Sequence, residues 1–493
     1  MAASDDPERE LAELRARYAA LEAEAEALRT ESAETTRELL RALADQRTAL
    51  EQSAHALAAS AALGASNTGR LISAYARWRQ RGRGLANGWR QMAAKRRARR
   101  RRIGVPRAVM TATPGVNVAG YINAESGMGE ATRCSIRALH HAGIPVALNN
   151  VPGPQRMADT TFTDFVDDNP HPFNLIHLNA DNMAWFAASR DRKYFSDRYT
   201  IGYWFWELES FRPDWLSAFD HVDEVWVASE HSRRSIGHDA PVPVVHVPLG
   251  LPEAECADVG REHFGIPERP FVFLYTFDVS SQMERKNPLG AVRAFRLAGL
   301  PHDRALLLLK FTNAQADREA VRRLADAASG LNVQMIDGAL ERREVSALMR
   351  ATDCCLSLHR AEGFGLTLAE QMAMGKPAIA TAYSGNLDFM TPEVSRLVPA
   401  RTVRIDRDYG PYLAGYAWAD PDLDAAAQYI RELALAPDHG RALGARGAAH
   451  VRKVLSLDRS ASLMKTRLRE IRAGALRVSG AAPSPDAPDP AYA

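Results

Sequence analysis

The 493-residue sequence has few cysteines, no signal peptide and no long apolar run. Its four cysteines lack the paired spacing of zinc sites, and the adjacent Cys354 and Cys355 lie in an apolar stretch typical of a buried strand. The acidic start, MAASDDPERE, lacks a basic segment followed by an apolar core, and no run of about 18 apolar residues occurs. These absences exclude a disulfide framework and a membrane-spanning helix, disfavour a zinc site, and predict a cytoplasmic protein.

Acidic residues are missing from one long segment. Residues 52–124 contain no Asp or Glu but 14 Lys and Arg, whereas residues 1–51 carry 13 acids and 7 bases. The formal net charge of the whole chain is nevertheless only +2, and 46% of its residues are apolar. This composition is typical of a soluble globular protein, and the chain is too long for one hydrophobic core. We therefore expect two globular domains with appended segments.

The apolar pattern of the first 69 residues predicts a coiled-coil helix. Apolar or small residues recur in a 3,4 spacing from Leu11 to Leu39, and a shifted register follows from Leu43 to Leu57. The change of register predicts an interruption near residue 40. The pattern favours self-association into a homo-oligomer, and the alternative is a single solvated, Ala-rich helix.

Residues 70–110 form a basic, Arg-rich linker, with seven Lys and Arg between positions 95 and 102 and interleaved Trp78 and Trp89. Cations with interfacial Trp suit an anionic membrane surface, which residues 70–107 would contact. A disordered, solvated linker is an equally good interpretation. Nucleic acid would be attracted by the same charge, but no module for specific nucleic-acid recognition is present.

From residue 111 onward, short β-rich runs alternate with helical stretches, which predicts an α/β fold with parallel sheets. We expect one domain over residues 111–255, a second over 256–455, a terminal helix over 456–475 and a disordered tail over 476–493. The predicted strands are Val116–Tyr121, Pro145–Val151, Asn174–Leu178, Tyr199–Trp206, Glu224–Ala228, Val242–Val247, Phe271–Thr276, Ala305–Phe311, Asn332–Ile336, Cys354–Leu358 and Ala378–Thr381.

The most informative stretch runs from Arg360 to Pro377, between a predicted strand and a helix. Glu362 precedes the helix, Glu370 lies two turns inside it, and Gly363 and Gly365 leave main-chain N–H groups open to a ligand. Two carboxylates so placed suit the recognition of hydroxyl groups at two points of one elongated ligand. A glycine-capped helix with an acidic N-terminus is the purely structural alternative.

This stretch resembles the E-x7-E motif of retaining glycosyltransferases with the GT-B fold, especially glycosyltransferase family 4 and its bacterial polysaccharide-assembly branch. The EGFGL core and the following GKPAIAT carry the resemblance, which extends over residues 114–455. It implies two doubly wound Rossmann-like domains that face a cleft. It also implies that Glu362 holds the donor sugar and Glu370 the nucleotide ribose. The donor-binding residues it implies are Gly363, Phe364, Gly365, Leu366 and Glu370.

A second match to this family is the basic pair Arg285 and Lys286, placed before a helix, where the family binds the donor diphosphate. Negative charge grows on the departing nucleoside diphosphate, so fixed cations stabilise the transition state without a metal. The family usually has an Arg several residues upstream, where this chain has Phe277, Asp278 and Ser280. The resemblance leaves open whether Arg285 takes the place of that residue. Solvated surface charge is the structural alternative.

The first domain and one further loop supply the remaining candidates. Gly127 and Gly129 follow the first strand and resemble the acceptor-side loop of the family, although tight turns also use glycine for steric reasons. His177 ends a predicted strand and resembles the histidine that similar enzymes place near the reacting sugar. Glu207 is the one carboxylate of an aromatic run that we expect in the cleft, and Asn386 belongs to a loop typical of the same branch.

The resemblance thus implies a retaining hexosyltransferase that uses a nucleoside diphosphate sugar of the mannose or glucose type. Its acceptor would be a glycan or a lipid-linked glycan in the synthesis of a cell-surface polysaccharide or glycoconjugate. We expect no metal and no cofactor, and a location in the cytoplasm or on the inner face of the plasma membrane. The alternative is a non-catalytic coiled-coil scaffold whose degenerate body merely binds nucleotide sugar.

Overall fold

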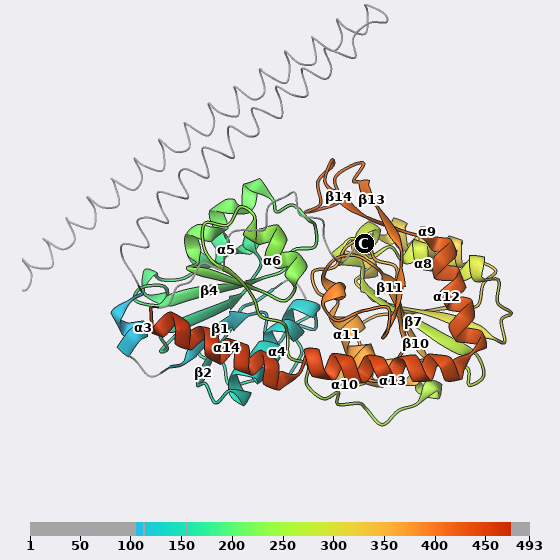
Figure 1. Ribbon diagram of the computed structural model, residues 1–493, viewed down its shortest axis with the longest axis horizontal. Coiled ribbons are helices and arrows are strands. Elements are labelled where there is room, and N and C mark those ends of the chain that lie inside the picture. The colour runs from blue at the N-terminus through green and yellow to red at the C-terminus, as the bar shows by residue number, and fades with distance from the viewer. Residues whose placement is uncertain (1–104, 112–113, 154–155, 475–493) are drawn as a thin grey trace, which may run out of the picture. The chain divides into compact units, whose positions relative to one another are not determined.

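We analyse a computed structural model of the chain, which describes residues 105–111, 114–153 and 156–474 (Figure 1). All of these residues lie within one compact unit. They form two α/β domains, each built on a six-stranded parallel sheet. The coiled coil expected over residues 1–69, most of the basic linker and the tail at 476–493 lie outside the described residues.

The first sheet has the strand order β2-β1-β3-β4-β5-β6, and every neighbouring pair is parallel. Most of its strand residues are buried, because helices cover both faces of the sheet. The strands are β1 (Val116–Gly120), β2 (Val146–Asn150), β3 (Phe173–His177), β4 (Tyr199–Trp204), β5 (Glu224–Val227) and β6 (Val244–His246).

Helices α5 (Ala180–Ala188) and α6 (Glu230–Gly237) lie on one side of this sheet, and α4 (Gly127–His141) lies on the other (Figure 1). Two separate apolar clusters correspond to the two faces. The short helix α3 (Arg107–Thr111) and the 3₁₀ turns η1 (Arg192–Tyr194) and η2 (Pro213–His221) complete this domain.

The second sheet has the order β12-β11-β10-β7-β8-β9, again with parallel neighbours. Strand β8 reads ALLLLKFT and is buried over almost its whole length, as expected for a central parallel strand. The strands are β7 (Phe271–Asp278), β8 (Ala305–Thr312), β9 (Val333–Asp337), β10 (Cys354–Ser357), β11 (Ala378–Thr381) and β12 (Arg396–Val398).

Helices again cover both faces of the second sheet (Figure 1). One face packs against α8 (Pro288–Ala298), α9 (Arg318–Ala328) and α12 (Leu423–Leu435). The other face packs against α10 (Arg342–Ala351), α11 (Leu366–Ala373) and α13 (Pro437–Val454). The short helix α7 (Met283–Lys286) and the 3₁₀ turns η3 (Arg261–Phe264), η4 (Val279–Ser281), η5 (Ala314–Ala316) and η6 (Gly385–Asp388) lie between these elements.

The last helix, α14 (Leu457–Arg472), follows α13 and packs beside α4 of the first domain (Figure 1). Arg467 forms a bidentate ion pair with Glu224, at 2.6 and 2.9 Å, and the Glu224 side chain is completely buried. Tyr199 and Trp226 also donate to this carboxylate. A buried carboxylate needs such partners, so the pair ties the C-terminal helix to the first sheet.

The two-domain parallel α/β architecture is confirmed, and each of the eleven predicted strands is present within a few residues of its expected bounds. Sequence analysis missed β12 and the antiparallel hairpin β13 (Ala400–Arg404) and β14 (Ala417–Pro421). Strand β13 lacks the alternation of apolar and polar residues by which a half-buried strand is recognised, because nearly all of its residues are exposed. No helix in the described part of the chain combines the length and apolar character needed to cross a bilayer.

Candidate active site

Most of the predicted site residues lie beyond the carboxyl ends of parallel strands, the edge at which α/β proteins bind ligands. Strand β10 ends at Ser357, and the chain reaches helix α11 at Leu366 through the predicted donor loop. Gly365 caps this helix with a φ of +92°, a left-handed conformation that suits glycine. Its N-cap residue makes no side-chain capping bond, so the first N–H groups of the helix have no cap from that side chain.

Glu362 lies against two cations. Lys286 Nζ donates to Glu362 Oε1, and Arg285 Nη1 lies 3.4 Å from the same oxygen. Only 13% of the Glu362 side chain is exposed. Burial by itself would raise the pKa of Glu362, but Lys286, Arg285 and nearby His359 lower this pKa to about 2. The carboxylate is therefore ionised at any physiological pH and can accept hydrogen bonds from sugar hydroxyls.

The two cations play different parts around this carboxylate. Arg285 donates to the main-chain oxygens of Ala361 and Ser281, at 2.9 and 3.2 Å, and its side chain is only 6% exposed. Its guanidinium also lies 5.6 Å from the ring centre of Tyr412. The Lys286 side chain is 18% exposed, and burial lowers its pKa while Glu362 partly restores it. Arg285 thus braces the loop, and Lys286 is the better candidate for a diphosphate.

Glu207 reaches the same centre from the first domain. Its Oε1 lies 4.0 Å from Arg285 Nη2, so Arg285 stands between Glu207 and Glu362. Three of the four aromatic residues that directly precede Glu207 are core: Tyr203, Trp204 and Trp206 are each no more than 2% exposed, while Phe205 is only partly buried. The expectation that these rings pack and that Glu207 is the carboxylate at the site is consistent with this arrangement.

The Glu362 loop is clamped by the turn that follows strand β11. Ser384 Oγ accepts from Glu362 N at 2.7 Å, and Gly385 N donates to Glu362 O at 2.9 Å. A Cβ atom on Gly385 would lie only 2.3 Å from Gly363 O, so glycine is required there by close packing. Asn386 is completely buried and donates to Thr381 O at 3.0 Å, while its Oδ1 faces His359 at 3.2 Å. Its amide holds the turn, and the predicted ligand contact of Asn386 stays a prediction.

The remaining residues of the donor loop are fixed by the fold. Gly363 O accepts from Ser229 Oγ of the first domain at 2.6 Å, and Phe364 is buried in the core against Phe389. Leu366 is the first residue of α11. These contacts leave main-chain N–H groups, not side chains, as the means by which Gly363, Phe364, Gly365 and Leu366 would bind a donor.

Glu370 lies on the second turn of α11 and pairs with Arg342, the first residue of α10. Arg342 Nη2 lies 2.5 Å from Glu370 Oε1. Burial and the neighbouring carboxylate Glu130 raise the pKa of Glu370, and Arg342 opposes them only in part. Glu370 thus differs from Glu362, because Arg342 is the only cation among the described residues that forms an ion pair with it.

The predicted acceptor-side loop ends in the first turn of helix α4, where Gly127 and Gly129 have different reasons to be glycine. A Cβ atom on Gly129 would lie 2.2 Å from Ala124 O, so close packing requires glycine there. Nothing lies within 4 Å of the corresponding position on Gly127, which leaves that part of the loop open. Ser126 caps helix α4 by accepting from Gly129 N at 3.2 Å. Gly127 is therefore the glycine at which a ligand has room to approach.

His177 is completely buried at the end of β3 and stacks on Tyr203, with ring centres 4.4 Å apart. Burial lowers its pKa to about 3, so the ring stays neutral. Neither ring nitrogen has a hydrogen-bond partner among the described residues. Among the described residues, no hydrogen bond joins the His177 ring to Glu362, Arg285 or Lys286, and its predicted catalytic role stays a prediction.

Sequence reasoning missed several residues at these centres. Arg342 begins a helix through a capping box formed by Glu341 and Glu344, which is a local signal for a helix start but not for a site. Tyr412 comes from the unforeseen β13–β14 hairpin. Among the described residues, no group of three His, Cys, Asp or Glu side chains is arranged to hold a metal ion.

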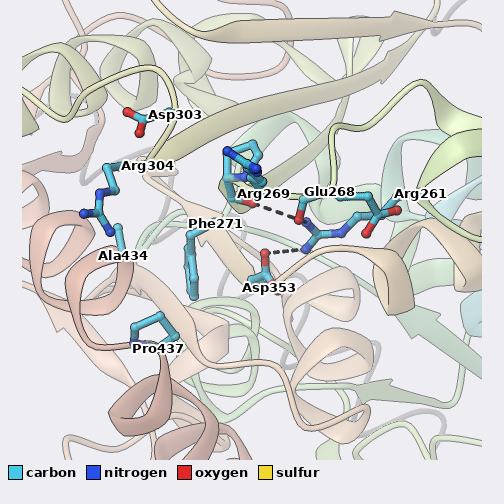
Figure 2. A pocket seen from close by; sticks show the side chains of 10 residues that line it. Arg261, Glu268, Arg269, Phe271, Asp303, Arg304, Asp353, Ala434 and Pro437 are labelled. Atoms are coloured by element: carbon cyan, nitrogen blue, oxygen red, sulfur yellow. Dashed lines mark hydrogen bonds and ion pairs between the residues drawn. The ribbon is translucent and has the colours of Figure 1, made fainter.

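A cavity of about 390 Å³ lies in the second domain at the opposite, amino ends of its strands (Figure 2). Arg261 crosses it, donates to Glu268 O and pairs with Asp353 at 2.6 Å. The lining of the cavity holds three arginines and three acidic residues, so it carries no net charge that would favour an anion. The cavity is lined by Arg261, Glu268, Arg269, Pro270, Phe271, Asp303, Arg304, Asp353, Ala434 and Pro437.

The arrangement of two parallel α/β domains is that of GT-B glycosyltransferases, as comparison with solved structures shows. The sucrose-phosphate synthase of Thermosynechococcus elongatus is 18% identical with a TM-score of 0.54, over 73% of this chain and all of that one. A glycosyltransferase of Rickettsia africae is 14% identical with a TM-score of 0.52, over 73% of this chain and 99% of that one. Anabaena HepE, solved with UDP and glucose, is 13% identical with a TM-score of 0.52, over 73% and 100%.

Residues 260–448, most of the second domain, match the family model described as "Glycosyl transferases group 1". A search of curated proteins found no match. The family match thus covers most of the second domain, the fold is that of GT-B enzymes, and the chain is a glycosyltransferase. The matched segment contains Lys286, Glu362 and Glu370, three of the residues expected to bind a donor.

Proposed function

We propose that this protein is a metal-independent, retaining hexosyltransferase that takes a hexose from a nucleoside diphosphate sugar. The observation that carries the proposal is the cluster in which Lys286 and Arg285 face Glu362 at the start of α11. It combines an acceptor of hydroxyl hydrogen bonds with cations that suit a diphosphate. HepE, which shares the fold, was solved with UDP-glucose, and this supports a nucleotide sugar as donor.

Each residue of the cluster has a part in this proposal. Glu362 accepts hydrogen bonds from hydroxyls of the sugar, and Lys286 neutralises the diphosphate as negative charge grows on it. The N–H groups at the start of α11 add to the same positive field. Glu370 accepts from the ribose hydroxyls. Arg285 holds the loop that carries Glu362 through its bond to Ala361 O.

The proposed reaction breaks the bond between the sugar C1 and the diphosphate oxygen. The acceptor hydroxyl oxygen forms its bond to C1 on the same face of the sugar, and its proton passes to the departing diphosphate oxygen. The products are a glycoside and a nucleoside diphosphate, so no external acid or base is consumed. We assign no nucleophile to the protein, and the fixed cations supply the electrostatic stabilisation.

The acceptor and the setting follow from the same resemblance. We propose a glycan or lipid-linked glycan acceptor and a role in cell-surface polysaccharide or glycoconjugate synthesis. The Arg-rich residues 70–107 would then dock on an anionic membrane, and the coiled coil of residues 1–69 would join copies of the chain. Titration of the full chain with vesicles containing 30% anionic lipid, against neutral vesicles, tests the docking.

The proposed activity is tested by supplying GDP-mannose, UDP-glucose, UDP-N-acetylglucosamine and related donors in the presence of EDTA. Release of nucleoside diphosphate and transfer to glycan acceptors are both measured. We expect turnover that E362Q loses and that the exposed-surface control K453A retains. Donor binding without turnover, with acceptors supplied, would favour the scaffold alternative, and absence of both would contradict the proposed function.

A further inference from the structure

Arg342 lies between two carboxylates that belong to different domains. Its Nη2 lies 2.5 Å from Glu370 Oε1 on α11, and its Nε lies 3.9 Å from Glu130 Oε2 on α4. Both carboxylates are nearly buried, with 9% and 6% of their side chains exposed, while Arg342 is 29% exposed. An arginine fork is suited to hold two carboxylates at once, because its N–H groups point in fixed directions.

The ion pairs of Arg342 with Glu370 and Glu130 form a bridge between the domains, and further contacts connect Glu130 to the acceptor-side loop. Glu130 also pairs with Arg133 at 2.8 Å and Arg137 at 3.0 Å. Arg133 in turn donates to the main-chain oxygens of Ile122 and Ala124, at 2.7 and 3.0 Å, and lies 3.4 Å from Asp159. Residues 122–124 open the loop that leads into the first turn of α4, where Gly127 and Gly129 lie. A continuous series of ion pairs and hydrogen bonds therefore joins Glu370 to the start of α4.

The two ends of the bridge are not equally supplied with cations. Glu130 has Arg133 and Arg137 on its own helix, and these lower its pKa together with Arg342 against the effect of burial. Among the described residues, Arg342 is the only cation within ion-pair distance of Glu370. The charged or titratable groups that face Glu370 are Arg342 from α10 and Glu130, Arg133 and Cys134 from α4. A change at Glu370 therefore acts first on Arg342.

We propose that Arg342 is a positioning residue that couples Glu370 of the donor domain to Glu130 and the acceptor-side loop of the other domain. The inference rests on the proposed function in one respect, because it takes Glu370 as the ligand of the donor ribose. Ribose hydroxyls that donate to Glu370 compete with Arg342 for the same oxygens. The freed guanidinium then turns toward Glu130. Donor binding thereby changes the stability of the segment at residues 122–130.

The first test measures hydrogen exchange of the full chain for wild type, R342Q, R342K and R343Q. Arg343 is the matched control, because it is the exposed neighbour of Arg342 on the same helix. We expect R342Q to accelerate exchange at residues 122–131 by about fivefold, the scale of a modest coupling. R342K should restore part of the protection, and R343Q should leave it unchanged. Unchanged exchange in R342Q, or equal acceleration in R343Q, would overturn the proposal.

The second test adds UDP or GDP, each at saturating concentration as judged by calorimetry. We expect the bound nucleotide to change exchange at residues 122–131 in wild type and not in R342Q. A nucleotide that binds wild type without altering this loop would overturn the coupling. A wild-type protein that binds neither nucleotide nor any donor would contradict the proposed function, and the first test would still decide whether Arg342 links the loop to α11.

Discussion

Glu362 and Glu370 belong to one motif and one strand-to-helix junction, yet their surroundings are opposite. Glu362 meets two cations, and its pKa falls to about 2. Glu370 has one arginine, which it shares with Glu130, and its pKa is raised. Both carboxylates are mostly buried, so the difference comes from the charges around them and not from exposure.

This comparison teaches that two carboxylates at a fixed spacing need not have the same task. A carboxylate that is permanently ionised between cations suits the point where charge develops during the reaction. A carboxylate whose charge depends on one shared arginine suits a binding contact that responds to its neighbours. We therefore expect substitutions at Glu362 to reduce kcat, and substitutions at Glu370 to raise the KM for the donor.

The largest effect is expected from the cluster around Glu362. E362Q and K286A should each reduce kcat/KM by about 10²- to 10³-fold, the usual loss when one preorganised charged contact to the transition state is removed. Steady-state transfer assays measure this loss. Circular dichroism and the thermal midpoint serve as folding controls, since each variant leaves a partly buried charge without its partner. Near-normal transfer by both folded variants would contradict the assigned roles.

E370Q should give a smaller loss of a different kind. It replaces a charge-assisted hydrogen bond to the ribose with a neutral one, so we expect the donor KM to rise by about tenfold while kcat changes less than threefold. The exposed-surface variant E393A is the matched control. A loss of kcat as large as that of E362Q would remove the difference between the two carboxylates on which the comparison rests.

The turn after β11 offers a way to disturb Glu362 without touching Glu370. S384A removes the hydroxyl that accepts from Glu362 N at 2.7 Å. We expect kcat to fall by about five- to tenfold, corresponding to one lost hydrogen bond, with the donor KM little changed. S384T is a poor control because the φ of Ser384 is +78°; S189A, at a helix end far along the chain, serves instead. An effect on KM alone would show that this turn does not position Glu362.

Much of this account could be predicted from sequence, and the reasons are local. Strands such as β8 and β10 are short continuous apolar runs between turn residues, so they are visible without knowledge of their neighbours. The donor loop could be placed because Glu362, the glycines and Glu370 lie within a few residues of one another. The separate roles of Lys286 and Glu362 followed from the family resemblance, not from spacing, and their direct contact was not predicted.

What escaped prediction depends on contacts between distant segments. Arg342 looks like an ordinary charged residue at a helix start, and its partners on α4 and α11 are known only once both domains are folded. The hairpin that carries Tyr412 has no alternating pattern, since one of its strands is almost wholly exposed. The burial of His177 likewise depends on Tyr203 of the neighbouring strand.

The smallest effect concerns pH. Because the pKa of Glu370 is raised, this side chain takes up a proton earlier than Glu362 as the pH falls. We expect the donor KM of wild type, measured from pH 7.5 down to pH 4.5, to rise as the pH falls, with the dependence lost in E370Q. Glu362, with a pKa of about 2, should contribute nothing in this range. A rise that persists in E370Q would assign the dependence to another group.

The most direct test of the central claim is transfer from a panel of nucleoside diphosphate sugars in EDTA, with wild type and E362Q compared at the same concentration. The account predicts turnover of one class of donor by wild type, undiminished by EDTA, and a loss of at least a hundredfold in E362Q. Turnover that requires a divalent metal, or that survives in folded E362Q, would contradict it.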